Sequence, residues 1–552
     1  MNEDFFPVNS ETLVVIGAGA TAALGMPTTE KQTEIFRNLS EAKSDEEIKK
    51  CLSEYFIKQD LAKVLAFLRL LDCDDFFEIR HSDIQNAKVI YGQKSEELLR
   101  KRILELRSEY DWNAAKRVLK LCPHNEKSDN LIRDAYSIID QKILARQSIK
   151  VQLENGEEVI PESRLKGARN FLTLFINMLF SAKWYRIAIG EKTEEFEKYK
   201  SFVNSLDRMM RNEGHRFYKK HTSESRGFYL WTTSFVSFNF EMVFPWLFMN
   251  LHRHLNKKDT TYIGNRPMQL WLDFGCEHRG RKTKDGKIVP TLEFTESVAS
   301  RQNEADHAGN ELHRCGKFYF AHGSSNWREC PVCGRMTFYN GDSKTKWECK
   351  SKQLVAPFPI PLFENDKIDA FTQKEIQWRK ELQYDALQCM HCGSKTLALD
   401  APMIMQTLHK SAPTSFLEEI QRNVKVAIQK ARHIVVLGYS FPIDDTVWQQ
   451  AFSEGVRSRE NGQEAYCSVV VGLGGERRWL YGNELTEFIN GNRNTALKSA
   501  ASAIENALAI FELKKVRAWT GGIPQVFGNC AERDVKCLLY PDFVNWDGTR
   551  LE

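Results

Sequence analysis

Short apolar runs followed by glycines predict the strands of this chain. Thr12 to Ile16 is β-branched and apolar, and it leads directly into the glycine-rich segment from Gly17 to Thr21. His433 to Leu437 and Ser468 to Gly472 have the same character. Apolar runs that end in a turn are typical of buried strands in a parallel sheet. Further strands are predicted at Phe235 to Phe238 and at Lys317 to Phe320.

Helical periodicity separates these strands. From about residue 30 to 225, apolar residues recur three and four positions apart, and charged residues occupy the faces between them. Two more helices are predicted after residue 410, the second from Ala501 to Leu513. Strands that alternate with helices favour an α/β fold, here interrupted by a large helical insertion. The apolar positions that predict the helices include Leu61, Val64, Leu65, Leu68, Leu71, Phe171, Leu174, Phe175, Met178, Leu179, Phe196, Tyr199, Val203, Leu206, Met210, Ile420, Val424 and Ile428.

Composition and charge exclude several classes of protein. The chain has 552 residues, 42% of them hydrophobic and 27% charged, which is typical of a globular protein with about three or four structural units. Its net charge of +4 argues against a protein that binds nucleic acid by charge alone. No apolar run approaches the roughly 20 residues of a membrane span, and the start lacks a signal-peptide pattern. The expected location is the cytoplasm.

Four of the 13 cysteines form two C-x-x-C pairs, Cys330 with Cys333 and Cys389 with Cys392. Each pair is followed by glycine, and two such pairs can close a tetrahedral structural zinc site. Cys349 lies between the pairs and is a further candidate ligand. Unrelated buried cysteines and a redox dithiol are the alternative interpretations.

Polar residues with catalytic potential follow two of the predicted strands. His322 precedes Gly323 where the strand near Phe320 ends, and a histidine with its ordinary pKa is a natural general base for a ribose hydroxyl or a water molecule. Asn239 and Glu241 follow the strand that begins at Phe235, and an amide and a carboxylate two residues apart can face one ligand. We therefore expect a site at this edge of the sheet.

Taken in order, these motifs resemble the sirtuin family. The likeness comprises Gly17-Ala-Gly-Ala-Thr21 with Gly25-Met-Pro27, then Asn239-Phe-Glu241, His322-Gly323, the cysteine pairs and Gly438-Tyr-Ser440. It covers about residues 1–30, 230–250 and 315–475. The resemblance implies an NAD site, with His322 and Asn239 catalytic. The residues that it places around NAD are Gly17, Ala18, Gly19, Ala20, Thr21, Asn239, Glu241, His322, Gly438 and Ser440.

The departures from the sirtuin pattern bear on the reaction. Sirtuin deacylases carry a Phe-Gly-Glu strand end that clamps acyl-lysine, whereas this chain has Leu399 to Lys410 with no such motif. The Phe-Arg pair expected after Gly-Ile-Pro is absent, and Glu241 replaces an aspartate. The variants resemble divergent bacterial sirtuin-like proteins that hydrolyse NAD in antiphage defence. We therefore expect an NAD glycohydrolase that releases nicotinamide and ADP-ribose, with structural zinc.

Two other functions remain open on the sequence. One is protein deacylation or mono-ADP-ribosylation with NAD. The other is a module without catalysis that senses NAD or ADP-ribose, or that docks nucleic acid through a basic stretch from Arg208 to Lys220. The expected partners are NAD and a second copy of the chain or a defence protein; a membrane is not expected, and nucleic acid is the less favoured ligand.

The predicted fold class is thus α/β, a Rossmann-like, sirtuin-like parallel sheet with a four-cysteine zinc subdomain and a large helical insertion. Residues 1–30 would contain the first strand and the glycine-rich turn, and residues 31–225 the insertion. Residues 226–323 would continue the sirtuin-like domain and 324–400 form the zinc subdomain. Residues 401–552 would complete the domain with a C-terminal helix and tail.

Overall fold

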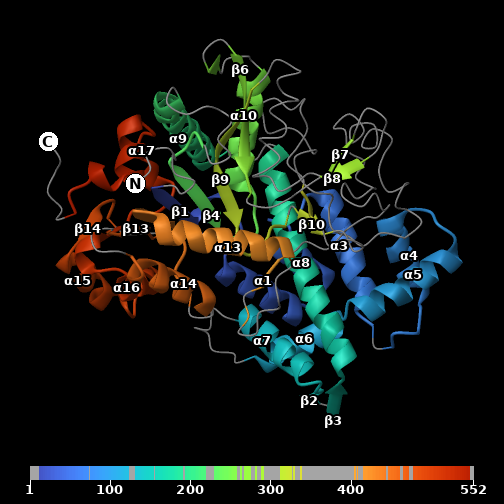
Figure 1. Cartoon of the computed structure of the whole chain (residues 1–552). Coiled ribbons are helices and arrows are strands. Elements are labelled where there is room, and N and C mark those ends of the chain that lie inside the picture. The colour runs from blue at the N-terminus through green and yellow to red at the C-terminus, as the bar shows by residue number, and fades with distance from the viewer. Residues whose placement is uncertain are drawn as a thin grey trace.

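The computed structural model of the chain describes the elements that surround the predicted site (Figure 1). The described residues are 11–73, 75–122, 131–153, 156–189, 193–218, 229–257, 262–263, 266–274, 280–282, 288–290, 311–325, 327–329, 336–338, 403–405, 407, 415–442, 445–459, 464–471 and 476–546.

The described residues form an α/β structure around one mostly parallel sheet of nine strands. The strands are parallel from β15 to β6, and the short edge strands β14 and β5 are antiparallel. In order across the sheet they are β14 (Trp479–Tyr481), β15 (Val516–Trp519), β13 (Tyr466–Val470), β12 (His433–Leu437), β1 (Thr12–Ile16), β4 (Thr233–Ser237), β9 (Glu311–Phe320), β6 (Arg266–Asp273) and β5 (Tyr262–Ile263).

The order of the strands reverses at the centre of the sheet. From β1 the chain moves outward to β4 and then to the outer strands β5 and β6, and β9 is inserted between β4 and β6. The chain then returns to form β12, β13 and β15 on the other side of β1. β1 and β12 therefore lie side by side while their connections lead in opposite directions. This order is compatible with a Rossmann-like fold, in which ligands bind at the carboxyl ends of the strands where the order reverses.

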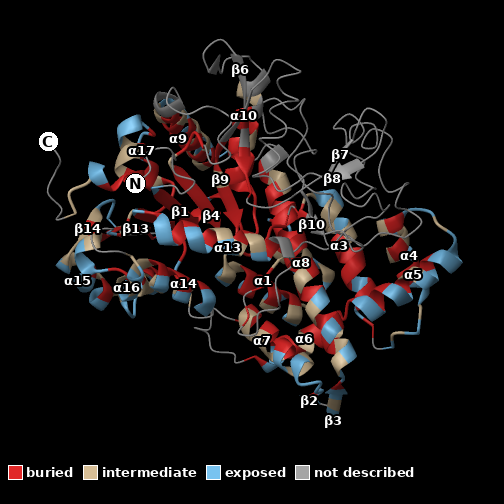
Figure 2. Ribbon diagram, in the orientation of Figure 1, coloured by how far each residue is buried: buried red, intermediate tan, exposed pale blue. Residues whose placement is uncertain are grey.

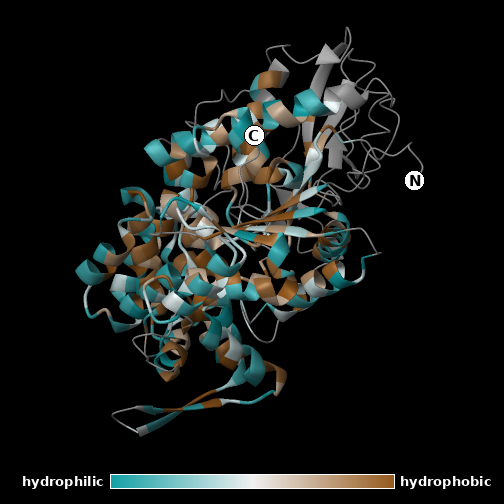
Figure 3. Cartoon of the chain, turned by 90° about the vertical axis from the view of Figure 1, so that its left-hand side faces the viewer, coloured by the Kyte–Doolittle hydropathy of each residue, from teal (hydrophilic) through white to brown (hydrophobic). Residues whose placement is uncertain are grey.

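Helices cover both faces of the sheet (Figures 1 and 3). α13 (Ser415–Lys430), α14 (Thr446–Arg457) and α16 (Lys498–Ile510) form one group, which contacts β9, β13 and β15. α9 (Glu194–Tyr218), α10 (Val243–Lys257) and α17 (Glu532–Leu539) form another, which contacts β6 and β12. The residues of β1 and β12 are all buried, as expected for central strands covered on both faces (Figure 2).

The helices between β1 and β4 pack around one long helix, α8 (Glu162–Ile189). Around it lie α1 (Thr29–Glu41), α2 (Asp45–Leu52), α3 (Lys58–Leu71), α4 (His81–Tyr91), α5 (Glu96–Glu109), α6 (Trp112–Leu121) and α7 (Leu131–Leu144). The apolar stripes predicted in α3, α8 and α9 are confirmed as helical, and almost all of their residues are buried. A projecting hairpin of β2 (Ile149–Leu153) and β3 (Gly156–Ile160), visible at the bottom of Figures 1 and 3, was not predicted.

Other predictions were shifted or incomplete. The late helix α16 begins at Lys498 and ends at Ile510, before the expected end at Leu513, because the chain turns to enter β15. Within the basic segment 279–289 and the residue after it, β7 (Gly280–Lys282) pairs antiparallel with β8 (Ile288–Pro290). β6 and β15 were missed, since neither has the long apolar run that marked the central strands. No described helix has the length and apolar character of a membrane span.

A buried hydrogen-bond relay joins the sheet to the C-terminal segment. Arg517 Nε donates to Ser468 Oγ (2.7 Å), and Ser468 Oγ lies 2.8 Å from Nε2 of His433. Because a carbonyl oxygen can only accept, Nδ1 of His433 carries the proton and donates it to Leu539 (2.5 Å). Nε2 of the neutral ring is then an acceptor, so the serine hydroxyl donates to it. Burial lowers the pKa of His433 to about 3, with a further lowering from the charge of Arg517.

Candidate active site

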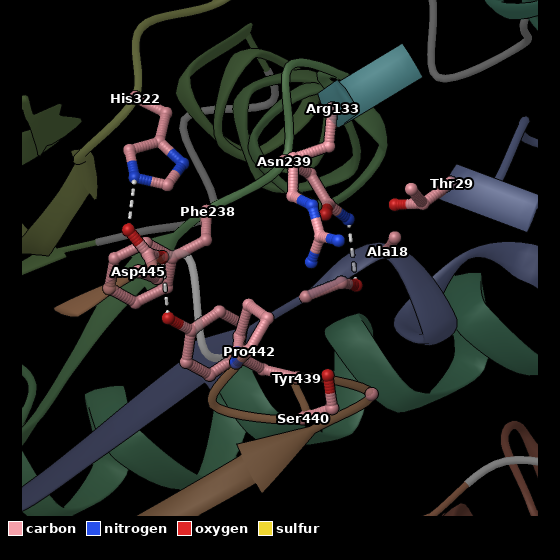
Figure 4. A pocket seen from close by; sticks show the side chains of 12 residues that line it. Ala18, Thr29, Arg133, Phe238, Asn239, His322, Tyr439, Ser440, Pro442 and Asp445 are labelled. Atoms are coloured by element: carbon pink, nitrogen blue, oxygen red, sulfur yellow. Dashed lines mark hydrogen bonds and ion pairs between the residues drawn. The ribbon is translucent and has the colours of Figure 1, made fainter. Parts of the chain in front are cut away.

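A pocket lies where the strand order reverses, at the carboxyl ends of β1, β4, β9 and β12 (Figure 4). Most of its lining comes from the turns that follow these strands, and two residues come from helices of the block between β1 and β4. The lining residues are Gly17, Ala18, Thr29, Arg133, Phe238, Asn239, His322, Gly438, Tyr439, Ser440, Pro442 and Asp445.

The glycine-rich turn after β1 packs directly against the turn after β12. Gly438 has a φ of +63°, and a Cβ on it would lie 2.2 Å from the amide nitrogen of Ala20. A Cβ on Gly17 would lie 2.5 Å from the carbonyl oxygen of Gly438. A side chain at either position would therefore push the two turns apart. This close approach requires glycine at Gly17 and Gly438 whether or not a ligand binds.

The backbone amides of the turn are used within the protein. The N–H of Gly17 donates to Leu437 (2.9 Å), that of Gly19 to Gly438 (3.0 Å) and that of Ala20 to Gly17 (2.9 Å). No α-helix begins directly after the glycines. Two short 3₁₀ turns, η1 (Ala18–Ala20) and η2 (Ala22–Leu24), follow β1, and α1 begins only at Thr29. These three amides are thus unavailable to a phosphate.

Asn239 joins the turn after β4 to the glycine-rich turn. Its Nδ2 donates to the carbonyl of Gly17 (2.7 Å) and to Oε1 of Glu241 (3.2 Å). Because both of these partners are acceptors, the orientation of the amide is determined, and Oδ1 is directed elsewhere. No described residue donates to Oδ1, so this oxygen is available to accept a hydrogen bond from a water molecule or a ligand.

Glu241 lies behind the pocket rather than in its lining. Its Oε1 accepts hydrogen bonds from Thr21 and Asn239, both at 3.2 Å, and its Oε2 accepts from the backbone N–H of Val243 (2.5 Å) at the start of α10. Burial raises the pKa of Glu241, although these three hydrogen bonds oppose that effect. The carboxylate therefore holds the glycine-rich turn against β4 and α10.

His322 is buried at the end of β9, and its ring faces Asp445. Nε2 lies 3.4 Å from Oδ1 of Asp445, longer than an ordinary hydrogen bond but within ion-pair distance. The other carboxylate oxygen, Oδ2, accepts a hydrogen bond from Tyr439 (2.6 Å). Phe238 contacts the edge of the imidazole, with ring centroids 5.1 Å apart. Figure 4 shows the second ring nitrogen, Nδ1, on the side that faces Asn239.

The position of the His322 backbone is held from several directions. Its carbonyl accepts a hydrogen bond from the N–H of Ile404 (2.8 Å). The hydroxyls of Ser324 and Ser325 each donate to the carbonyl of Phe240 at 3.0 Å, which ties the turn after His322 to the turn after β4. The imidazole is thus presented by a rigid turn.

The structure gathers many of the predicted site residues, although they are far apart in the sequence. Gly17, Ala18, Asn239, His322, Gly438 and Ser440 all line the pocket. Gly19, Ala20, Thr21 and Glu241 are not in the lining and support it from behind. The expectation that each of them touches a ligand therefore has no support in the pocket's geometry.

Four lining residues with polar side chains were not predicted as site residues: Asp445, Arg133, Thr29 and Tyr439. Asp445 precedes α14 in the run Gly-Tyr-Ser-Phe-Pro-Ile-Asp-Asp, where an aspartate is easily interpreted as a helix cap. Its side chain makes no capping hydrogen bond and turns to Tyr439 and His322 instead. Arg133 and Thr29 belong to helices, and no sequence motif marks either of them.

The predicted zinc ligands Cys330, Cys333, Cys389 and Cys392, and also Cys349, lie outside the described residues. Within the described residues, one buried group offers metal-ligand atoms within 4.8 Å of one another: Asp207, His252 and Cys315. Asp207 already accepts from Arg211 (2.7 Å) and pairs with His252 (2.9 Å). Burial by itself would raise the pKa of Asp207, but His252 and Arg211 together lower it. Both carboxylate oxygens of Asp207 are thus already engaged, and we interpret this group as a buried network of hydrogen bonds and ion pairs.

Comparisons with protein-family models and with curated protein sequences find no match to this chain.

Proposed function

We propose that this chain is a sirtuin-like NAD hydrolase that releases nicotinamide and ADP-ribose. The observation that carries the proposal is the convergence of Gly17, Asn239, His322 and Gly438 on one pocket where the strand order reverses. These residues come from the turns after four different strands. Sheets of this kind bind nucleotides at that place. The motif resemblance then identifies NAD as the nucleotide.

The proposed reaction breaks the bond between C1′ of the ribose and the nicotinamide nitrogen. The electron pair of that bond leaves with nicotinamide and neutralises its positive charge, so C1′ develops oxocarbenium character. The oxygen of a water molecule then bonds to C1′, and the water loses one proton to a base. The products are nicotinamide, ADP-ribose and a proton.

Three side chains are placed to assist this reaction. Oδ1 of Asn239 accepts a hydrogen bond from the water and thereby orients it. Nδ1 of His322 takes the proton as the water attacks. The carboxylate of Asp445, beside Nε2, orients the ring and stabilises the imidazolium that forms, as the third member of a nucleophile–base–orienter group does. Phe238 and Tyr439 supply apolar walls that exclude other water.

The segment after the predicted zinc subdomain favours hydrolysis over deacylation. Met403 pairs with Gly323 through an antiparallel bridge, and Ile404 donates its N–H to the His322 carbonyl. Ile404 and Met405 are buried. This stretch lacks the Phe-Gly-Glu motif with which sirtuin deacylases clamp acyl-lysine, and that absence is the reason to favour hydrolysis.

Incubation of the purified protein with NAD, with nicotinamide followed by chromatography, tests the proposal. We expect stoichiometric nicotinamide and ADP-ribose, and no release by His322→Ala. An acyl-lysine peptide and a protein acceptor are included as competing substrates. NAD-dependent deacylation, or ADP-ribose found on protein, would identify one of the transferases instead, and NAD binding without nicotinamide release would identify a sensing module.

The finer parts of the proposal follow from the resemblance. A four-cysteine zinc site at Cys330, Cys333, Cys389 and Cys392 would be structural. An enzyme that depletes NAD must be regulated, so we propose that its activity depends on assembly of the chain or on a defence partner. We also propose that it acts in antiphage defence in the cytoplasm.

A further inference from the structure

The pocket includes a positive charge that the sirtuin resemblance did not predict. Arg133 lies in the first turn of α7, and Figure 4 shows its guanidinium reaching from that helix toward the space between Asn239 and the turn after β12. Among the described lining residues, it is the only side chain with a permanent positive charge. The only carboxylate among them belongs to Asp445, which is engaged by Tyr439 and His322.

A dinucleotide brings a diphosphate into such a site, and much of the glycine-rich turn is already engaged. The N–H groups of Gly17, Gly19 and Ala20 donate to backbone carbonyls. The glycines themselves are required by the close approach of Gly438. α1 begins at Thr29, so no α-helix N-terminus directly follows β1. A charged side chain in the lining is therefore the strongest candidate to neutralise the phosphates.

Arg133 pairs with its neighbour Asp134 in this structure. Nε and Nη2 both contact the same oxygen of Asp134, at 3.2 and 3.1 Å, and Nη1 takes no part in these hydrogen bonds. The guanidinium therefore makes no bidentate pair with a carboxylate here, and Nη1 can donate to a phosphate oxygen. The planar fork of arginine fits phosphate oxygens better than any other side chain does.

We infer that the helices between β1 and β4, here called the helical block, complete the active site. Arg133 of α7, which belongs to this block, binds the diphosphate of the dinucleotide. The inference rests on the proposed function for the identity of the ligand. It gives the helical block a part in substrate binding: α7 must be packed in place for the site to hold an anionic ligand. The ligand class is a nucleoside diphosphate, and a nucleoside without phosphate would not use this residue.

Calorimetry with ADP-ribose and with adenosine tests the inference, beside a nicotinamide-release assay. Arg133→Gln should weaken ADP-ribose binding about ten- to a hundred-fold, because a hydrogen-bonded charge is lost. Its affinity for adenosine should stay unchanged. The KM for NAD should rise by a similar factor while kcat changes much less. Arg133→Lys should retain part of the affinity as a point charge, and Asp134→Asn should retain or tighten it, because a competing carboxylate is removed.

Arg100→Gln is the matched control, since Arg100 is a half-exposed arginine of α5 paired with Glu96. It should bind ADP-ribose as the wild type does. Equal binding by Arg133→Gln and Arg100→Gln would overturn the inference, as would a wild type that does not distinguish ADP-ribose from adenosine. If ADP-ribose binds through Arg133 and no nicotinamide is released, the hydrolase proposal fails and the diphosphate site stands. Thermal unfolding of each variant separates a binding loss from misfolding.

Discussion

Nε2 of His322 lies 3.4 Å from Oδ1 of Asp445, so a histidine at the end of β9 faces a carboxylate at the start of α14. In the sheet, β9 lies on one side of β1, and β12, the strand before α14, lies on the other. Considered alone, each residue has an ordinary structural explanation. Both line one pocket, and in the proposed reaction they act as a base and its orienting partner. This pair is the feature on which the proposed chemistry depends most.

His322→Ala should abolish nicotinamide release and leave NAD binding largely intact. The base acts on the reacting water and contributes little to contacts with the phosphates or the adenine. Loss of a general base costs roughly 10²–10⁴ in rate. A turnover assay beside calorimetry with NAD measures both effects. Nicotinamide release at the wild-type rate would show that this active-site assignment is wrong.

Asp445→Asn should also slow the reaction, by about a hundred-fold or more, because the ring loses the charge that stabilises its protonated form. Tyr439→Phe is the control, since it removes only the hydrogen bond to Oδ2 and leaves the carboxylate beside His322. We expect Tyr439→Phe to lose much less activity. Equal rates of nicotinamide release by the wild type and Asp445→Asn would mean that Asp445 has only a structural role.

Gly438→Ala should destabilise the protein by more than the roughly 1–3 kcal/mol of backbone strain alone. The φ of +63° is unfavourable for alanine, and the new Cβ would lie 2.2 Å from the nitrogen of Ala20. Gly482→Ala is the matched control, because Gly482 also has a positive φ (+49°) but no atom within 4 Å of an added Cβ. Comparison of the two variants by urea unfolding separates the free-energy cost of backbone strain from that of the steric clash. Similar losses would mean that the two turns can move apart.

The stability of the protein should fall as the pH falls below 6.5, through His433. This histidine is neutral in the folded protein, where its pKa is about 3, whereas the ordinary pKa of histidine is 6.5. Between these values the unfolded chain binds a proton that the folded chain does not, so protonation favours unfolding. The expected slope from this group is about 1.4 kcal/mol per pH unit. Urea unfolding at pH 7.5, 6 and 5 should show that the slope is smaller in His433→Gln; an identical slope would contradict the assignment.

Cys330→Ser and Cys389→Ser should each lose bound zinc and destabilise the part of the chain around the cysteine pairs, because the free energy of metal binding contributes to folding. Elemental analysis should find about one zinc per wild-type chain and much less in either variant. Cys467→Ser is a control for the loss of a cysteine elsewhere, since Cys467 is buried in β13. A wild type without zinc that is folded and active would contradict the prediction.

Local sequence patterns were sufficient to predict the central strands and the helices with strong apolar periodicity. Thr12 to Ile16 and His433 to Leu437 are strands as predicted, because an apolar run covered on both faces has few alternatives. The same patterns placed Asn239 and His322 after strands, and the turns after parallel strands meet at one edge. Gly438 came from the sirtuin resemblance.

Which side chains meet in the pocket depends on how distant elements pack. Asp445 resembles a helix cap in the sequence, and its approach to His322 depends on how the start of α14 is positioned relative to the end of β9. No local sequence pattern indicates that Arg133 lines the pocket, because its position there depends on the packing of α7 near the end of β1. The sequence also could not show that the turns at Gly17 and Gly438 touch. Long-range packing sets these relationships, and local propensity and spacing do not encode it.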